Sequence, residues 1–222
     1  LKYFREEYRR HIEDKRCDAF VCKNLVGAPC QAACPVDTEP WRYVALIEKG
    51  QYEQAYQIIR EANPLPAISA RVCDRKCEHR CSLGVGGGEA IAVRAMKRFV
   101  TDRVDPAVYH PDMHSANGQG KKVAVVGAGP AGLAAAHGLS LLGHKVTIIE
   151  AEQEPGGMLA CSLPAYRLPR RIVRAEIATL MNENIRLQHG VVLGKDATIR
   201  ELFAEGFKAI FLAMGAHESW RL

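Results

Sequence analysis

Two patterns of hydrophobic and polar residues divide this chain. Up to about residue 118, apolar residues recur at three- and four-residue intervals, which is typical of amphipathic helices. After residue 119, short apolar runs alternate with helical segments, and this alternation predicts a mostly parallel sheet. The first part is expected to hold helices over 3–15, 40–50, 52–62, 73–81 and 89–104, with irregular chain over 16–37.

The second part predicts strands and helices in alternation. The strands are expected over 122–126, 145–149, 185–187, 191–193 and 209–213, and the helices over 131–142, 170–181 and 199–204, with a loop over 155–169. A linker rich in Pro, Gly and Asn covers 105–120. We therefore predict an α+β multidomain chain, in which an all-α domain over residues 1–118 precedes a Rossmann-like α/β domain over 119–222.

Composition excludes some classes of function. The net charge is +5, but Lys and Arg are dispersed and interleaved with Glu, which argues against nucleic-acid binding. We expect no membrane span, because no apolar run reaches about 18 residues. The N-terminus lacks the apolar region of a signal peptide, so we expect a cytoplasmic, reducing compartment. The chain begins without Met, and we interpret it as a fragment or an excised region.

Cysteine is concentrated in the first part of the chain. The sequence holds eight cysteines, and the seven in this region are Cys17, Cys22, Cys30, Cys34, Cys73, Cys77 and Cys81. The pair Cys34-Pro35 matches the end of the bacterial ferredoxin motif. Zinc sites favour C-x2-C pairs, and none is present here. Disulfide frameworks favour an even count and a secretory context, whereas this region holds seven cysteines. The spacing favours two [4Fe–4S] clusters, which need about eight ligands, so one ligand remains unassigned.

A glycine motif follows the first predicted strand of the second part. The residues Gly127, Ala128, Gly129, Pro130, Ala131 and Gly132 form G-x-G-x-x-G between a strand and a helix. Glu150 stands at the end of the next strand, where an acid accepts hydrogen bonds from ribose hydroxyls. The motif predicts a dinucleotide pyrophosphate at the helix N-terminus, and it does not separate FAD from NAD. Cys161 lacks a C-x-x-C partner and is expected to be a buried thiol.

The chain resembles the glutamate synthase small-subunit family, which includes the N-terminal part of dihydropyrimidine dehydrogenase. The resemblance spans about residues 16–215 and is carried by Ala33-Cys34-Pro35, Asn63-Pro64-Leu65-Pro66-Ala67, Arg71-Val72-Cys73, the segment 77–81, Arg98-Phe99-Val100, the segment 127–132, Glu154-Pro155-Gly156-Gly157, Tyr166-Arg167-Leu168-Pro169 and the segment 209–213. It implies two [4Fe–4S] clusters in a helical domain and FAD in a first nucleotide-binding domain. It also implies that NAD(P)H binds a second such domain of the full-length protein.

The resemblance also implies roles for individual residues. One cluster would be held by Cys17, Cys22, Cys30 and Cys81, and the other by Cys34, Cys73 and Cys77. The family's fourth ligand to the second cluster is Gln or Glu, and Lys97 occupies that position here. Beside the glycine motif and Glu150, the implied FAD-binding residues are Gly157, Met158, Arg167 and Leu193. The family has Thr at position 214, where this chain has Met.

Residues 1–16 resemble a different protein, namely the tail of the NADH-binding flavoprotein subunit of complex I. Three hypotheses follow. The first is an NAD(P)H-linked oxidoreductase that transfers electrons between FAD and [4Fe–4S] clusters. The second is a relay module of a bifurcating hydrogenase, transhydrogenase or formate dehydrogenase complex, with other electron-transfer subunits as partners. The third is a non-enzymatic zinc-binding scaffold. NAD(P)H itself is not expected to bind productively to this chain alone.

Overall fold

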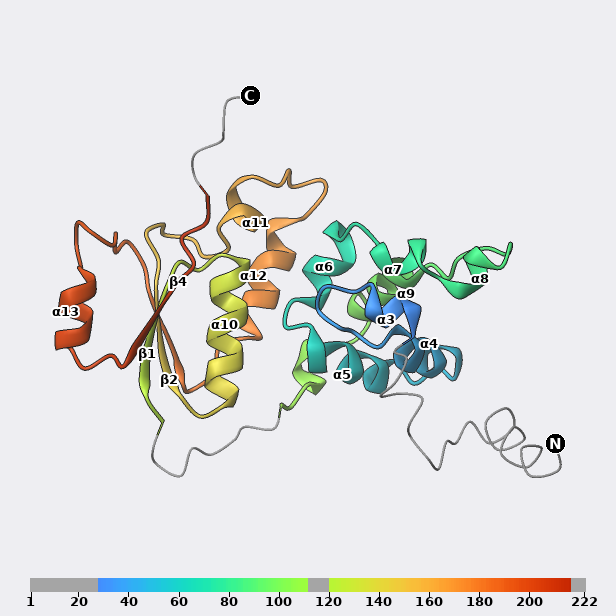
Figure 1. The fold of residues 1–222 in the computed structure, drawn as a ribbon, viewed down its shortest axis with the longest axis horizontal. Helices are drawn as coiled ribbons and strands as arrows, with labels where there is room; N and C mark the ends of the chain where they lie inside the picture. The colour runs from blue at the N-terminus through green and yellow to red at the C-terminus, as the bar shows by residue number, and fades with distance from the viewer. Residues whose placement is uncertain (1–27, 112–119, 217–222) are drawn as a thin grey trace.

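The computed structural model describes residues 28–111 and 120–216. Figure 1 shows a helical part and a part built on a sheet, placed side by side along the longest axis. The predicted helix over 3–15 lies outside the described residues, as do Cys17 and Cys22. No helix among the described residues is both long and apolar enough to cross a membrane.

Residues 28–111 form short helices and no strand. The helices are α3 (Pro29–Ala32), α4 (Pro40–Glu48), α5 (Tyr52–Ala62), α6 (Pro66–Val72), α7 (Lys76–His79), α8 (Ser82–Val85), α9 (Val93–Thr101) and the 3-10 turn η2 (Pro106–Val108). Proline at the first position begins α3, α4 and α6, because its fixed φ suits that position and it lacks the N–H that would have no partner there. Tyr43, Tyr56, Ile59 and Val100 form the centre of the core of this part, since each is at most 1% exposed.

The second part is a four-stranded parallel sheet in the order β3-β2-β1-β4. Its elements are β1 (Lys122–Val126), α10 (Pro130–Leu141), β2 (Lys145–Ile149), α11 (Met158–Cys161), α12 (Arg170–Ala178), β3 (Ile185–Gln188), α13 (Ile199–Ala204) and β4 (Ala209–Leu212). The last four residues of β1 and of β2 are buried, as expected for central parallel strands covered on both faces. This is the predicted α/β arrangement.

Helices cover the sheet unequally. On one face, Leu133 of α10 and Val173 of α12 pack with the sheet residues Val125 and Ile148. On the other face, Leu202 of α13 joins a smaller apolar cluster. Figure 1 shows α10 and α12 on the side of the sheet that faces the helical part, and α13 on the far side.

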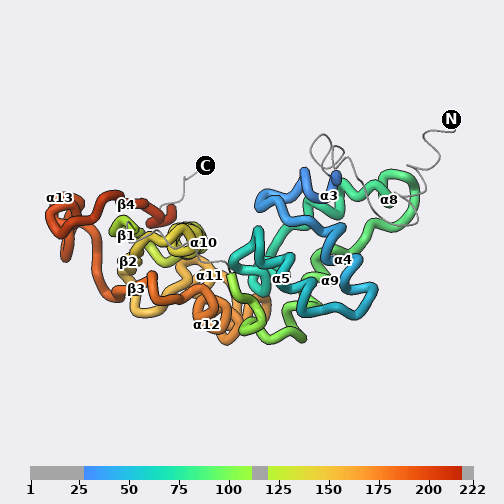
Figure 2. Tube along the Cα trace, turned by 90° about the horizontal axis from the view of Figure 1, so that it is seen from below, coloured from blue at the N-terminus to red at the C-terminus, as the bar shows by residue number. Residues whose placement is uncertain are grey.

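One buried cluster contains residues of both parts. Leu65 and Ile68, from the helical part, belong to the same buried cluster as Val125 and Leu133. The carboxylate of Glu176 in α12 accepts hydrogen bonds from the backbone N–H groups of Ala67 and Ile68, both 2.6 Å long. Figure 2 shows α5 and α12 near the boundary between the two parts. Helix α6 therefore joins them, and Arg60 of α5 adds a hydrogen bond to the hydroxyl of Thr179.

The structure corrects the predicted helix over 73–81. Only Lys76–His79 is helical there, because Arg75 has a left-handed φ of 62° that separates α6 from α7. Cys73 is the C-cap of α6 and Cys81 the N-cap of α8, so the three cysteines do not lie on one helix.

Other local predictions were also wrong. Val191–Leu193 is not a strand. Gly190 and Gly194, both with positive φ, flank it, and a single bridge between Leu193 and Ala197 replaces the ladder. Helices α6 and α8 were not predicted, and α3 and α11 lie in segments that were expected to be irregular.

Candidate functional site

Cys30 and Cys81 approach each other from distant segments of the helical part. Cys30 lies in α3, which packs against α7, and Cys81 is the buried cap of α8. Burial raises the pKa of the Cys30 thiol, and the charge of Cys81 adds to this effect. Backbone N–H groups, with that of Ile91 first, lower the pKa of Cys81. These two thiols are thus within electrostatic reach of each other.

Cys34, Cys73 and Cys77 form a second group. Burial raises the pKa of the Cys77 thiol, and the charges of Glu78, Cys34 and Cys73 raise it further. The sulfur of Cys34 lies 3.1 Å from the hydroxyl of Thr38, a residue that is only 3% exposed. All six cysteines that the structure describes are free thiols.

The chemistry of these thiols is that of iron–sulfur ligands. Within residues 28–111 and 120–216, no three Cys, His, Asp or Glu side chains converge closely enough to bind one metal ion. A [4Fe–4S] cluster is larger than an ion and takes four thiolates around its outside. Cysteine thiolates are the ligands that such a cluster takes, so the described thiols fit it by their chemistry.

Lys97 lies on the buried face of α9 with Val93 and Val100, and is 7% exposed. Its ammonium group makes neither a hydrogen bond nor an ion pair with another described residue. A charged ammonium has no lone pair with which to bind iron. The structure therefore supplies no side-chain oxygen at the position where the resembled family has its fourth ligand.

The glycine motif forms a tight turn between β1 and α10. Gly127 has φ of 103°, and a Cβ there would collide with the carbonyl oxygen of Ala213. A Cβ on Gly132 would collide with the carbonyl oxygen of Gly127. At Gly129 a Cβ would meet no atom within 4 Å. The space beside Gly129, at the N-terminus of α10, fits a pyrophosphate held by backbone N–H groups.

Glu150 is anchored beside this turn. It is 8% exposed, and its carboxylate accepts hydrogen bonds from the N–H groups of Ala128 (2.5 Å) and Glu152 (2.9 Å). A second glycine pair packs against this turn, and we call the two glycine segments together the glycine cradle. The N–H of Gly156 donates to the carbonyl of Ala128, and a Cβ on Gly157 would lie 3.0 Å from the Cα of Gly129. Gly157 and Glu150 thus lie beside the glycine motif, and their role in FAD binding stays a prediction.

Arg167 points elsewhere. With Tyr166 it lines a cavity of about 440 Å³ against the helical part. The other lining residues are Ala70, Arg71, Arg75, Glu78, Ala92, Arg94, Ala95 and Arg98. Arg94 donates to the carbonyl of Cys73, and Arg71 and Arg98 pair with Asp102. The cavity is therefore lined mainly by arginines, with Glu78 paired to Arg75, and it adjoins Cys73. The sequence did not predict this cavity.

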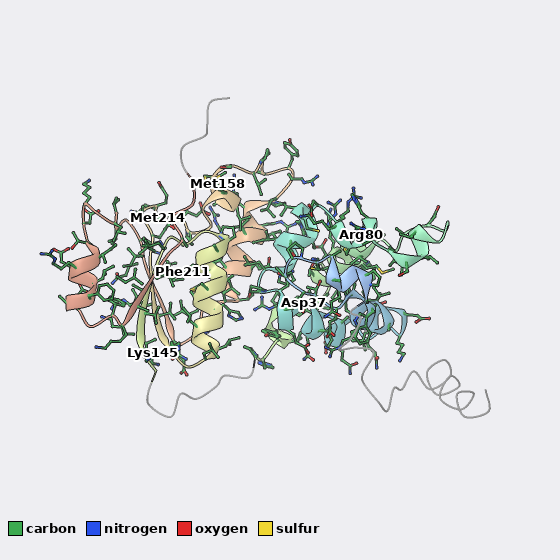
Figure 3. The ribbon with its side chains drawn as sticks, in the orientation of Figure 1. Asp37, Arg80, Lys145, Met158, Phe211 and Met214 are labelled. Atoms are coloured by element: carbon green, nitrogen blue, oxygen red, sulfur yellow. The ribbon has the colours of Figure 1, made fainter. Side chains whose placement is uncertain are left out.

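Met158 and Leu193 are the remaining residues that the sequence predicts to bind FAD. Met158 is 60% exposed, and Leu193 packs in the cluster under α13. Figure 3 shows Met158 and Met214 at the end of the sheet opposite to Lys145, the first residue of β2. Cys161 is exposed, so the prediction of a buried thiol was wrong; the one-turn helix α11 carries it at the surface.

His137 has a structural environment. It is 6% exposed within α10, and burial lowers its pKa to about 4. Its Nδ1 atom is buried and has no hydrogen-bond partner among the described residues. A neutral histidine in an apolar helix face agrees with the structural role expected from the sequence.

Comparison with known proteins finds matches to both parts of the chain. Residues 2–107 match the family model of the dihydropyrimidine dehydrogenase domain that carries a 4Fe–4S cluster, and residues 125–179 match an NAD(P)-binding Rossmann-like domain. The chain is 38% identical over 221 residues to the NADP(+)-dependent formate dehydrogenase subunit beta of Moorella thermoacetica, with 90% of this chain and 31% of that protein covered.

Two further relatives extend the comparison. The NAD-dependent dihydropyrimidine dehydrogenase subunit PreT of Salmonella typhimurium is 34% identical over 89% of this chain and 48% of its own length. The glutamate synthase [NADPH] small chain of Escherichia coli is 34% identical over 90% of this chain and 42% of its own length. This chain is similar in sequence to these three proteins. It spans about a third to a half of their length. The resemblance to the glutamate synthase small-subunit family is confirmed, whereas the resemblance of residues 1–16 to the complex I subunit stays a prediction.

Proposed function

We propose that this chain transfers electrons between FAD and two [4Fe–4S] clusters as part of an NAD(P)H-linked oxidoreductase. The observation that carries the proposal is the gathering of cysteines from α3, α7 and the ends of α6 and α8 into one region of the helical part. Homologues named as NADPH-linked or NAD-dependent oxidoreductase subunits support the same function.

The proposed ligand sets follow the two thiol groups. Cys30 and Cys81, with Cys17 and Cys22 from outside the described residues, would hold one cluster. Cys34, Cys73 and Cys77 would hold the other, with its fourth ligand supplied by something other than a charged Lys97. When bound, clusters of this kind carry single electrons, and a flavin exchanges either one or two.

FAD is proposed for the glycine cradle. Backbone N–H groups at the start of α10 would hold its pyrophosphate, and Glu150 would accept hydrogen bonds from its adenosine ribose. The basic cavity beside Arg167 lies between this half of the molecule and the helices that bear the cysteines. Its positive charge would stabilise an anion that develops on a group bound nearby.

A second candidate is a relay module in a formate dehydrogenase complex. The 38% identity to a formate dehydrogenase subunit favours it. Its partners would be other electron-transfer subunits. Because free thiols and iron–sulfur clusters persist in a reducing compartment, the proposed location is the cytoplasm.

Cofactor counting with paired cysteine variants tests the proposal. After anaerobic purification, the wild-type chain should contain acid-labile sulfide, iron for two clusters and bound FAD. Cys77→Ser should lose about half of the iron and sulfide, because it removes one ligand of one cluster. Cys161→Ser is the matched control and should retain all of it, because Cys161 is exposed and outside both thiol groups. Zinc without sulfide would refute the proposal and restore the scaffold hypothesis.

A further inference from the structure

The hydroxyl of Tyr43 is buried without a hydrogen-bond partner. Tyr43 lies in the middle of α4 and is 0% exposed. Its Oη atom has no partner among the described residues. Because a buried hydroxyl in a native core is normally satisfied, an unpartnered one indicates that a group belongs beside it.

Cysteines lie in the same part of the core as Tyr43. Tyr43 belongs to the core cluster against which Cys77 packs, and α4 contacts α3, which carries Cys30. Burial raises the pKa of Tyr43, and the charges of Cys77, Cys34, Cys30 and Cys73 raise it further, with Cys77 first. A phenol hydroxyl is protonated near neutral pH even at its ordinary pKa, so the Tyr43 hydroxyl is available as a donor.

We propose that the Tyr43 hydroxyl donates a hydrogen bond to a sulfur atom of the cluster held by Cys34, Cys73 and Cys77, and thereby raises the reduction potential of that cluster. The inference rests on the proposed function, since it requires the cluster. Hydrogen bonds to cluster sulfurs are one of the factors that set these potentials. Reduction adds negative charge to the sulfurs, so a donated hydrogen bond stabilises the reduced state more than the oxidised state.

The test removes the hydroxyl and keeps the ring. Tyr43→Phe should lower the ratio of reduced to oxidised cluster about tenfold at a fixed solution potential, which is ~59 mV for a one-electron couple. The measurement is a redox titration of the anaerobically purified chain followed by EPR. Tyr56→Phe is the matched control, because Tyr56 is 1% exposed in the same core cluster and its hydroxyl interacts with Arg60 instead of a thiol. It should titrate like the wild type.

The outcomes separate the two proposals. Iron and sulfide are counted before each titration, so their absence from the wild type would refute the proposed function. With clusters present, an unchanged potential in Tyr43→Phe, or an equal shift in both tyrosine variants, would overturn the role of Tyr43. Replacement of Tyr43 with 3-fluorotyrosine is a second variant that preserves the ring and makes the hydroxyl a stronger donor. It should raise the potential, and a potential that is unchanged or lower would also overturn the proposal.

Discussion

Gly129 and Gly132 belong to one motif but are glycines for different reasons. A Cβ on Gly132 would strike the carbonyl oxygen of Gly127, whereas Gly129 has an ordinary φ of −75° and open space where its side chain would be. Gly132 therefore permits the close packing of helix and strand. Gly129 instead leaves room for the proposed pyrophosphate.

This difference predicts different behaviour for two alanine variants. Gly132→Ala should destabilise the fold by about 3 kcal/mol or more, because backbone atoms must shift. Gly129→Ala should lower the unfolding midpoint only slightly, because its φ suits alanine and only the N-cap preference is lost, and it should weaken FAD binding at least about tenfold. Thermal unfolding and flavin titration measure the two effects. A Gly129→Ala protein that binds FAD as tightly as the wild type would place the pyrophosphate elsewhere.

At the level of elements, Glu176 connects α12 to the start of α6. Burial raises the pKa of Glu176 to about 7, although the N–H groups of Ala67 and Ile68 and the charges of Arg60 and Arg71 act in the opposite direction. Because the pKa in the folded chain lies above the ordinary value of 4.5, folding takes up a proton in this range. The stability from this group is full below about pH 4.5 and is lost as the pH rises through about 7.

Glu176→Gln should remove this pH dependence. The amide keeps one acceptor oxygen for two N–H donors, so we expect a loss of ~1–3 kcal/mol near pH 6 and a flatter decline in stability between pH 6 and 8.5. Unfolding midpoints across this range measure both. Glu154→Gln is the control on the protein surface: its hydrogen bond to Arg174 holds the pKa of Glu154 below its usual value, outside the range tested. An equal flattening in both variants would contradict the assignment to Glu176.

For the whole molecule, the buried cluster that contains residues of both parts predicts that the two parts unfold together. Ile68 comes from the helical part but is 3% exposed within the cluster formed mainly by α10, α12 and the sheet. Ile68→Ala should cost about 3 kcal/mol and lower the midpoint by roughly 6–12 °C, because it leaves a cavity at the junction. Far-UV circular dichroism and the visible absorbance of bound cofactors should fall in one transition.

The control for this variant is Val85→Ala, which alters a side chain that is 77% exposed and should leave the midpoint unchanged. Two separated transitions in the wild type, or an Ile68→Ala effect confined to one of the two signals, would show that the parts fold independently. The boundary near residue 118 remains a prediction, and the linker around it lies partly outside the described residues.

Much of the secondary structure could be predicted because its signals are local. The bounds of β1 and β2 agree with those predicted from short apolar runs, and those of α5 and α13 agree with those predicted from apolar residues at helical spacing. Proline marks the start of several helices. The predicted helix over 73–81 failed because a single left-handed residue, Arg75, ends the helical path there. Nothing in the spacing of the cysteines revealed that conformation, since Arg is not a residue that favours it.

The sequence by itself determined the chemistry that this chain can carry: thiols at cluster spacing, a glycine motif between a strand and a helix, and an acid at the end of the next strand. Such motifs are visible because their function depends on residues that are close along the chain. Tertiary structure alone decided that Cys30 lies within electrostatic range of Cys81, that the Tyr43 hydroxyl is buried without a partner among the described residues, and that Glu176 connects the two parts. These contacts depend on how distant segments pack, and local periodicity carries no information about that.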